Sequence, residues 1–189
     1  MRYALLEICR RSAGFTLVEL LVTVVVFAIL LGIAVPAFRS FMQNDQQWVQ
    51  QNNLILALNT ARSEAIKSDL AGGARVCSST DGVTCTATPW EQGWIVLSAN
   101  PLNPNAGLKP LQVVGALPTG TTLREVNNGL TSITFLSNGA VTAPAAAAFK
   151  MCDMRGATYA RYLQVTLMGR VVASPNVGKD LNGAALACP

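Results

Sequence analysis

One carboxylate stands at the edge of a long apolar stretch near the start of the chain. Glu19 closes the segment Gly14-Phe15-Thr16-Leu17-Val18-Glu19, and residues 20–38 after it contain no charged side chain. As a helix, residues 20–38 would extend about 28 Å, close to the thickness of a bilayer hydrocarbon core. An acid at the mouth of such a helix costs about 2.5–3.5 kcal/mol on insertion scales, so it usually has a partner. The sequence therefore predicts a cationic partner for Glu19; the simpler alternative is a single-pass anchor whose interfacial Glu19 stays hydrated.

The residues before the apolar stretch form a short basic head. It carries Arg2, Glu7, Arg10 and Arg11, and it ends in Ser12-Ala13-Gly14. A secretory signal places its small-residue cleavage site after the apolar stretch, whereas here the small residues come before it. Cleavage at this point would leave the hydrophobic helix attached to the protein. The arginines favour a cytoplasmic location for this end.

The order of basic head, glycine, Phe-Thr-Leu-Val-Glu and apolar stretch resembles the class III leader motif of type IV pilins and type II secretion pseudopilins. The resemblance implies that residues 1–14 are a leader peptide. It also implies that a prepilin peptidase cuts between Gly14 and Phe15, and that Phe15 is then N-methylated. Glu19 would pair with the terminal amine of a neighbouring subunit during assembly. The implied partners are other major and minor pilins or pseudopilins, the peptidase and the inner membrane.

Composition fits one membrane-tethered domain and gives little support to catalysis. The chain has 189 residues, of which 51% are hydrophobic, 13% are charged and none is histidine. Removing residues 1–14 takes away three arginines and one glutamate, which lowers the formal net charge from +4 to +2. So small a charge does not indicate a polyanionic partner. Without histidine the commonest general base and metal ligand is missing, so we expect no catalytic residue, no metal and no cofactor.

The cysteine pattern predicts disulfides outside the cytoplasm. Cys9 lies in the leader, which leaves Cys77, Cys85, Cys152 and Cys188 in the remaining chain. Four cysteines allow three connectivities. Cys77–Cys85 is the most economical pair because the turn signal Asp81-Gly82 lies between them, and it leaves Cys152–Cys188. A zinc site is the less favoured alternative, since it would require closer cysteines or histidines.

A single long helix is predicted from residue 16 to about residue 70. Residues 15–38 would be its transmembrane or filament-core half and residues 39–72 its amphipathic half, with Gly32 and Pro36 breaking the first half. The pilin-like resemblance assigns the same helix-softening role to Pro36. The glycines of Leu70-Ala71-Gly72-Gly73 would end the helix. In the second half we expect an apolar stripe to face the head domain and an amide-rich face to lie opposite, the stripe comprising Phe38, Phe41, Trp48, Ile55, Leu58, Ala61, Ala65 and Ile66 and the other face Gln43, Asn44, Gln46, Gln47, Gln50 and Asn52.

Residues 73–189 are predicted to form a β-rich head domain with no second helix. Alternation places Ile133 and Phe135 on one face of a half-buried strand, and Asn138-Gly139 and Met168-Gly169 are hairpin signals. Trp90 and Trp94 are expected to cover the edge of a core. The fold class is therefore α+β, a long helix on an antiparallel sandwich or pair of sheets. The pilin-like resemblance implies the same architecture, the pilin fold. The expected strands are residues 74–78, 93–98, 111–115, 122–126, 132–136, 148–153, 161–167 and 170–173.

Several head segments look like those of the FimT/FimU and GspH group of minor pilins. They are Arg75-Val76-Cys77, Trp90-Glu91-Gln92-Gly93-Trp94-Ile95-Val96, Ile133-Thr134-Phe135 with Asn138-Gly139, and Leu163-Gln164-Val165-Thr166 before Gly169-Arg170. The resemblance implies a minor pilin that helps to initiate a type IV pilus or forms part of its tip. Its head would lie in the periplasm until the subunit enters the fibre. A GspH-like minor pseudopilin of a type II secretion system is the alternative.

Nucleic-acid binding is a further, less favoured alternative. Some FimT-like minor pilins bind DNA through a Gly-Arg-x-Arg motif, but the matching segment here is Gly169-Arg170-Val171-Val172, which lacks the second arginine. Arg161 and Arg170 are the candidate phosphate contacts, with Lys150, Arg155 and Lys179 as further cations that could gather near them. The simpler interpretation is that these are solvated charges at strand edges.

Overall fold

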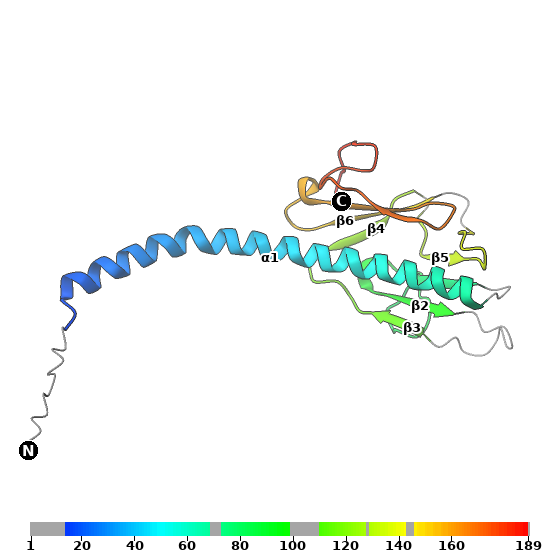
Figure 1. Ribbon diagram of the computed structural model, residues 1–189, viewed down its shortest axis with the longest axis horizontal. Coiled ribbons are helices and arrows are strands. Elements are labelled where there is room, and N and C mark those ends of the chain that lie inside the picture. The colour runs from blue at the N-terminus through cyan, green and yellow to red at the C-terminus, as the bar shows by residue number, and fades with distance from the viewer. Residues whose placement is uncertain (1–13, 69–72, 99–109, 128, 143–145, 189) are drawn as a thin grey trace, which may run out of the picture. The chain divides into compact units, whose positions relative to one another are not determined.

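The computed structural model describes residues 14–68, 73–98, 110–127, 129–142 and 146–188 (Figure 1). One helix, α1 (Leu17–Ser68), contributes to two compact units, Met1–Asn44 and Asp45–Pro189. The first unit contains the start of α1, and the second contains the rest of the helix together with all the strands. The leader expected at residues 1–14 lies outside the described residues except for Gly14, and so do residues 69–72 of the expected helix end.

The first unit is an apolar helix with its side chains exposed. From Leu17 to Arg39 no side chain is even partly buried. In the described part of the chain, α1 is the one helix long and apolar enough to cross a membrane. Gly32 and Pro36, at which we predict a break, both lie inside α1, which is continuous through them in this structure. Pro36 has no backbone N–H, so the Gly32 carbonyl loses the hydrogen bond that residue 36 would otherwise donate to it. Membrane helices tolerate the loss of one such hydrogen bond.

The helical part of the second unit buries a stripe that differs from the predicted one. Leu58, Ala61 and Ala65 are buried as expected, whereas Trp48 and Ile66 are about half exposed. The buried residues recur at the i, i+3, i+4 spacing of a helix, as predicted. The buried face is rotated relative to the predicted one, so that it includes two glutamines. Small alanines let the helix approach the sheets closely. The buried stripe comprises Gln47, Gln51, Leu54, Ala57, Leu58, Ala61 and Ala65.

Two four-stranded antiparallel sheets complete the second unit. Their strand orders are β3-β2-β1-β5 and β4-β6-β7-β8. All eight predicted strands are present with bounds that differ by at most two residues, and the pair of sheets on a helix confirms the predicted fold class. The strands are β1 (Ala74–Ser78), β2 (Trp94–Ser98), β3 (Pro110–Val114), β4 (Thr122–Glu125), β5 (Ser132–Phe135), β6 (Ala147–Cys152), β7 (Arg161–Val165) and β8 (Val171–Ala173).

Two short 3₁₀ helices, which the sequence did not indicate, join the strands: η1 (Trp90–Gln92) and η2 (Ala157–Tyr159). One core is shared by α1 and both sheets. Its fully buried side chains include Leu58 from the helix, Val96 and Phe135 from the first sheet, and Phe149 from the second. Figure 1 shows β2 and β3 on one side of the cyan part of α1 and β4 and β6 on the other.

The segment from Trp90 to Trp94 connects the two sheets. Trp90 Nε1 donates to the carbonyl of Leu130 at 2.7 Å, and its ring meets the Phe149 ring edge-on at 5.0 Å. The neighbouring Glu91 forms an ion pair with Arg124 of β4 at 2.6 Å. Trp90 is 2% exposed and Trp94 is fully buried, so both tryptophans are core residues as predicted.

Both predicted glycine turns lie beside the helix. Arg62 of α1 donates from Nε to the carbonyl of Gly139 at 3.2 Å and from Nη2 to the carbonyl of Met168 at 3.3 Å. Gly169 has φ +72°, and a Cβ there would lie 2.0 Å from the Gly139 carbonyl oxygen. Only glycine fits both this backbone conformation and this close approach. One helix side chain therefore holds two turns that are distant in sequence.

Glu125 is a buried acid whose oxygens organise a loop. It is 8% exposed. Its Oε1 accepts from the backbone N–H groups of Asn127 at 3.1 Å and Ala148 at 2.9 Å, and its Oε2 accepts from that of Leu130 at 2.9 Å. These bonds fasten the segment after β4 to the start of β6. The sequence offered no periodic signal for this role, because an isolated glutamate at a strand end is usually solvated.

We predict that Glu125→Gln destabilises the head domain by about 1–3 kcal/mol, since the new amide NH₂ would face a backbone N–H that loses its acceptor. The measurement is denaturant unfolding of the full chain in detergent with its disulfides intact. Asp45→Asn, an exposed change on α1, is the matched control. Equal unfolding midpoints for Glu125→Gln and the control would contradict the role given to Glu125.

Asp81 organises the loop between Cys77 and Cys85. Its Oδ1 accepts from the backbone N–H groups of Val83 at 2.9 Å and Thr84 at 2.8 Å and from the Ser79 hydroxyl, and its Oδ2 accepts from the Thr84 hydroxyl at 2.6 Å. These hydrogen bonds, that of the Thr84 hydroxyl foremost, hold the pKa of the Asp81 carboxyl well below its usual value. The loop is therefore built around an ionised carboxylate.

Because this pKa is depressed in the folded loop, the stabilisation is present above about pH 4 and is lost as pH falls towards the folded-state value. We expect amide protection factors of Val83 and Thr84 to be constant from pH 7 to about pH 4 and to fall at lower pH. Hydrogen exchange followed by NMR measures this. Asp81→Asn should remove the acid dependence, and a decline already complete at pH 5 would count against the assignment.

Candidate functional site

The motif residues at the start of α1 form a helix N-cap. Thr16 Oγ1 accepts from the backbone N–H of Glu19 at 3.2 Å, and the Thr16 carbonyl accepts from that of Leu20 at 3.1 Å. Thr16 is therefore the N-cap residue of the helix that begins at Leu17. The order Thr-x-x-Glu is also that of a capping box, a sequence signal that could have revealed this role of Thr16.

The Gly14–Phe15 bond lies just outside the helix. Both residues precede Leu17 and are exposed, Phe15 with 71% of its surface. A Cβ placed on Gly14 would meet no atom within 4 Å in the described residues. The fold of this chain therefore does not itself require glycine at position 14. A requirement for glycine would have to come from whatever binds this segment.

Glu19 lies in the first turn of α1 and is exposed. Carboxylates are favoured there because the helix macrodipole is positive at its N-terminal end. Glu19 follows Phe15 by four residues, about one helical turn or roughly 6 Å along a helix. The arrangement can form an ion pair with an amine, and the helix from residue 20 to residue 38 offers no competing charge.

All four described cysteines are in disulfides. Cys77 is bonded to Cys85 and Cys152 to Cys188, with Cα–Cα distances of 5.6 and 6.0 Å. This is the pairing that the loop spacing favoured. The first closes the Asp81 loop, and the second ties the end of β6 to the C-terminal tail. Among the described residues, no group of three or more His, Cys, Asp or Glu side chains could hold a metal ion.

The two candidate phosphate contacts, Arg161 and Arg170, lie at opposite ends of one strand. Arg161 begins β7 and Arg170 follows its other end, and five strand residues at about 3.3 Å each place these ends about 13 Å apart. Arg155 is paired with Asp153 at 2.6 Å, and Lys150 Nζ donates to the carbonyl of Ala187. Desolvation by burial lowers the pKa of Arg161, and the nearby charge of Arg155 lowers it further.

The fold and the N-terminal motif define a membrane-anchored protein of the pilin class. The family described as Type II transport protein GspH matches residues 50–169, more than half of the chain, and the prokaryotic N-terminal methylation motif matches residues 9–35. The chain therefore belongs to the GspH family, and it is a minor pilin or pseudopilin. No curated protein sequence matches the chain.

A solved structure supports this fold. A crystal structure of the type IV minor pilin FimU of Pseudomonas aeruginosa matches with a TM-score of 0.50 and 22% identity, covering 66% of this chain and 89% of that one. A second crystal form of FimU matches with a TM-score of 0.48 and 23% identity, covering 68% of this chain and 92% of that one. At these identities the first match supports the fold alone.

We predict that Gly14→Arg blocks removal of the leader. A Cβ at position 14 would meet no atom among the described residues, so any requirement for glycine there must come from the peptidase that binds the segment. The expected product is a full-length chain that retains residues 1–14, detected by mass spectrometry of the membrane fraction from the native host. Leu17→Ile, a conservative change inside the helix, is the control and should be processed normally. A Gly14→Arg chain that begins at Phe15 would contradict the predicted requirement for glycine at position 14.

Proposed function

We propose that this chain is a processed minor pilin that helps to initiate a type IV pilus or forms part of its tip. The leader is removed between Gly14 and Phe15, and the new amino group on Phe15 is methylated. Glu19 then pairs with the terminal amine of a neighbouring subunit. The observation that carries the proposal is the apolar helix from Leu17 to Pro36, exposed throughout, with Glu19 as its one charged side chain.

The cost of burying Glu19 depends on what surrounds the apolar helix. Before assembly, lipid covers its apolar surface, and Glu19 lies at the membrane edge. In a fibre, the helices of neighbouring subunits would replace the lipid. A carboxylate buried there is costly unless a cation lies beside it, and the terminal amine of the next subunit supplies one. The ion pair therefore favours the one alignment of neighbouring subunits in which a terminal amine lies beside Glu19.

Gly32 and Pro36 have a proposed part in this transfer. Because Pro36 has no N–H, the Gly32 carbonyl lacks its usual donor within the helix. This is a weak point at which the helix can bend or locally unwind as it leaves the membrane. The helix of the isolated chain is continuous at this point, so the softening would take place only in the packed fibre.

The proposed location is the inner membrane, with the head in the periplasm, followed by the fibre. Disulfides persist in oxidising compartments, which supports a periplasmic head. The proposed partners are other major and minor pilins, and the prepilin peptidase during processing. A nucleic-acid role has less support, since Arg161 and Arg170 lie at opposite ends of β7.

The second candidate is a minor pseudopilin of a type II secretion system, and the description of the matched family, Type II transport protein GspH, is compatible with it. Processing, membrane anchoring and the pairing of Glu19 would be the same in both. A deletion strain separates them: loss of surface fibres with normal secretion supports the pilus, and loss of secreted enzymes with normal fibres supports the secretion system.

We predict that Glu19→Val is processed and inserted normally but enters fibres at least tenfold less efficiently, because the neighbouring amine loses its counter-ion. Immunoblotting of sheared fibres against the membrane fraction measures this. Thr23→Val, one turn further on, is a matched loss of a polar side chain, since among the described residues the Thr23 hydroxyl bonds only within its own helix, to the Leu20 carbonyl. Normal incorporation of Glu19→Val would refute the pairing.

A further inference from the structure

Arg161 lies in a small surface site at one end of the second unit. Its guanidinium carbon is 5.6 Å from the centroid of the Trp48 ring, and its Nη1 donates to Gln51 Oε1 at 3.5 Å. Gln51 is itself held by a bond from its Nε2 to the Tyr162 carbonyl at 3.4 Å. The guanidinium is therefore positioned by a buried glutamine on one side and an aromatic ring on another.

Among the described residues, the N–H donors of the Arg161 guanidinium make few hydrogen bonds. Its Nε is buried and has no hydrogen-bond partner, and among the described residues no carboxylate forms an ion pair with it. An arginine has five N–H donors arranged to meet a carboxylate in a bidentate fashion. A half-buried guanidinium with one long hydrogen bond is thus costly in the isolated subunit and would gain from an external acceptor.

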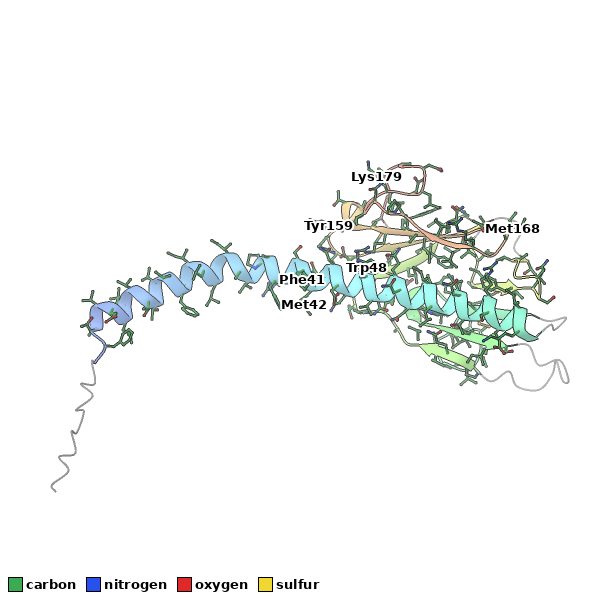
Figure 2. All side chains as sticks on the ribbon, in the orientation of Figure 1. Phe41, Met42, Trp48, Tyr159, Met168 and Lys179 are labelled. Carbon is green, nitrogen blue, oxygen red and sulfur yellow. A yellow bond between two sulfur atoms is a disulfide. The ribbon has the colours of Figure 1, made fainter. Side chains whose placement is uncertain are left out.

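Two exposed aromatic side chains lie near this cation, Trp48 in space and Tyr159 in sequence. Trp48 is 53% exposed and Tyr159, two residues before Arg161, is 39% exposed. Figure 2 shows both rings at the same end of the second unit, away from Met168. Tyr159 carries a second guanidinium, that of Arg155, at 4.1 Å from its centroid, but Asp153 neutralises that charge. Exposed tryptophan, tyrosine and arginine together are the residue types that dominate binding energy at protein interfaces.

The charge pattern favours one carboxylate over a polyphosphate. Nucleic-acid binding relies on several cations that contact successive phosphates. Here Arg161 is the one cation of the site without a carboxylate partner, and Arg170 lies at the far end of β7. A single guanidinium beside the exposed Trp48 ring, with the exposed Tyr159 two residues before it in the sequence, suits a single acidic side chain with apolar neighbours.

We propose that Trp48, Tyr159 and Arg161 form a docking site for an adjacent pilin-class subunit, which supplies an aspartate or glutamate to Arg161 and apolar side chains to the two rings. This inference rests on the proposed function, since it assumes that the chain stands beside other subunits in a fibre or pseudopilus. It adds a contact between head domains to the pairing of Glu19 with an amine. Gln51 is a positioning residue that holds the guanidinium in place.

The test uses the full chain in its native host, with Tyr159→p-benzoylphenylalanine as a photo-crosslinking probe beside an intact Arg161. Irradiation should give an adduct with another pilin-class subunit, with the crosslinked peptide identified by mass spectrometry and containing Asp or Glu. Adding Arg161→Gln should lower the adduct yield by about tenfold or more, as expected when one partner of a desolvated charge pair is removed. Arg170→Gln, an equal loss of charge at the other end of β7, should leave the yield within about twofold.

Charge reversal separates a specific contact from a folding defect. Arg161→Glu should abolish the adduct, and Asp→Arg or Glu→Arg at the mapped partner acid should restore it. Non-reducing gels check that both disulfides remain formed in each variant. An adduct that is sensitive to nuclease, or one that Arg161→Gln leaves unchanged, would overturn the docking site. A probe-carrying chain with intact Arg161 that enters fibres but gives no adduct would overturn this inference alone, whereas absence of the wild-type chain from both fibres and pseudopili would overturn the proposed function as well.

Discussion

The position of Glu19 beside an uncharged helix is the constraint on which the rest of the molecule depends. An acid at the start of residues 20–38 is tolerable at a membrane edge and costly inside a bundle of helices unless a cation accompanies it. The Thr16 N-cap starts the helix at Leu17, so Glu19 falls in the first turn, where the macrodipole favours a negative charge. The segment from Thr16 to Glu19 therefore holds the carboxylate at the N-terminal end of the helix before any partner is present.

In the head domain, specific contacts hold two sheets against one helix. Alanines at every fourth position let the sheets approach α1, and the Trp90–Glu91 segment fastens one sheet to the other through Leu130, Phe149 and Arg124. Arg62 holds two glycine turns against the same helix. The second unit therefore has one core in place of two separate layers, which suits a domain carried on a single helix.

Local patterns predicted much of this fold, and tertiary contacts account for the rest. Strand periodicity and turn glycines placed all eight strands, and the tryptophans near the disulfide loop were identified as core. The helix stripe was misplaced because Trp48 looks like a core residue by type, whereas Gln47 and Gln51 are the residues that are buried. Gln51 accepts a hydrogen bond from Arg161 of β7, which is 110 residues away in sequence. The buried role of Glu125 depends on three backbone donors that come together only when β4 and β6 pair.

The two disulfides separate the maturation of this protein into steps with opposite chemical requirements. Thiols remain reduced in the cytosol and are oxidised beyond the inner membrane. On the proposed topology, trimming of the amino end takes place at the cytoplasmic face, while Cys77–Cys85 and Cys152–Cys188 form on the other side. Export of the head must precede its covalent locking. A host with impaired thiol oxidation would therefore accumulate subunits that are correctly trimmed and anchored but carry an unlocked head.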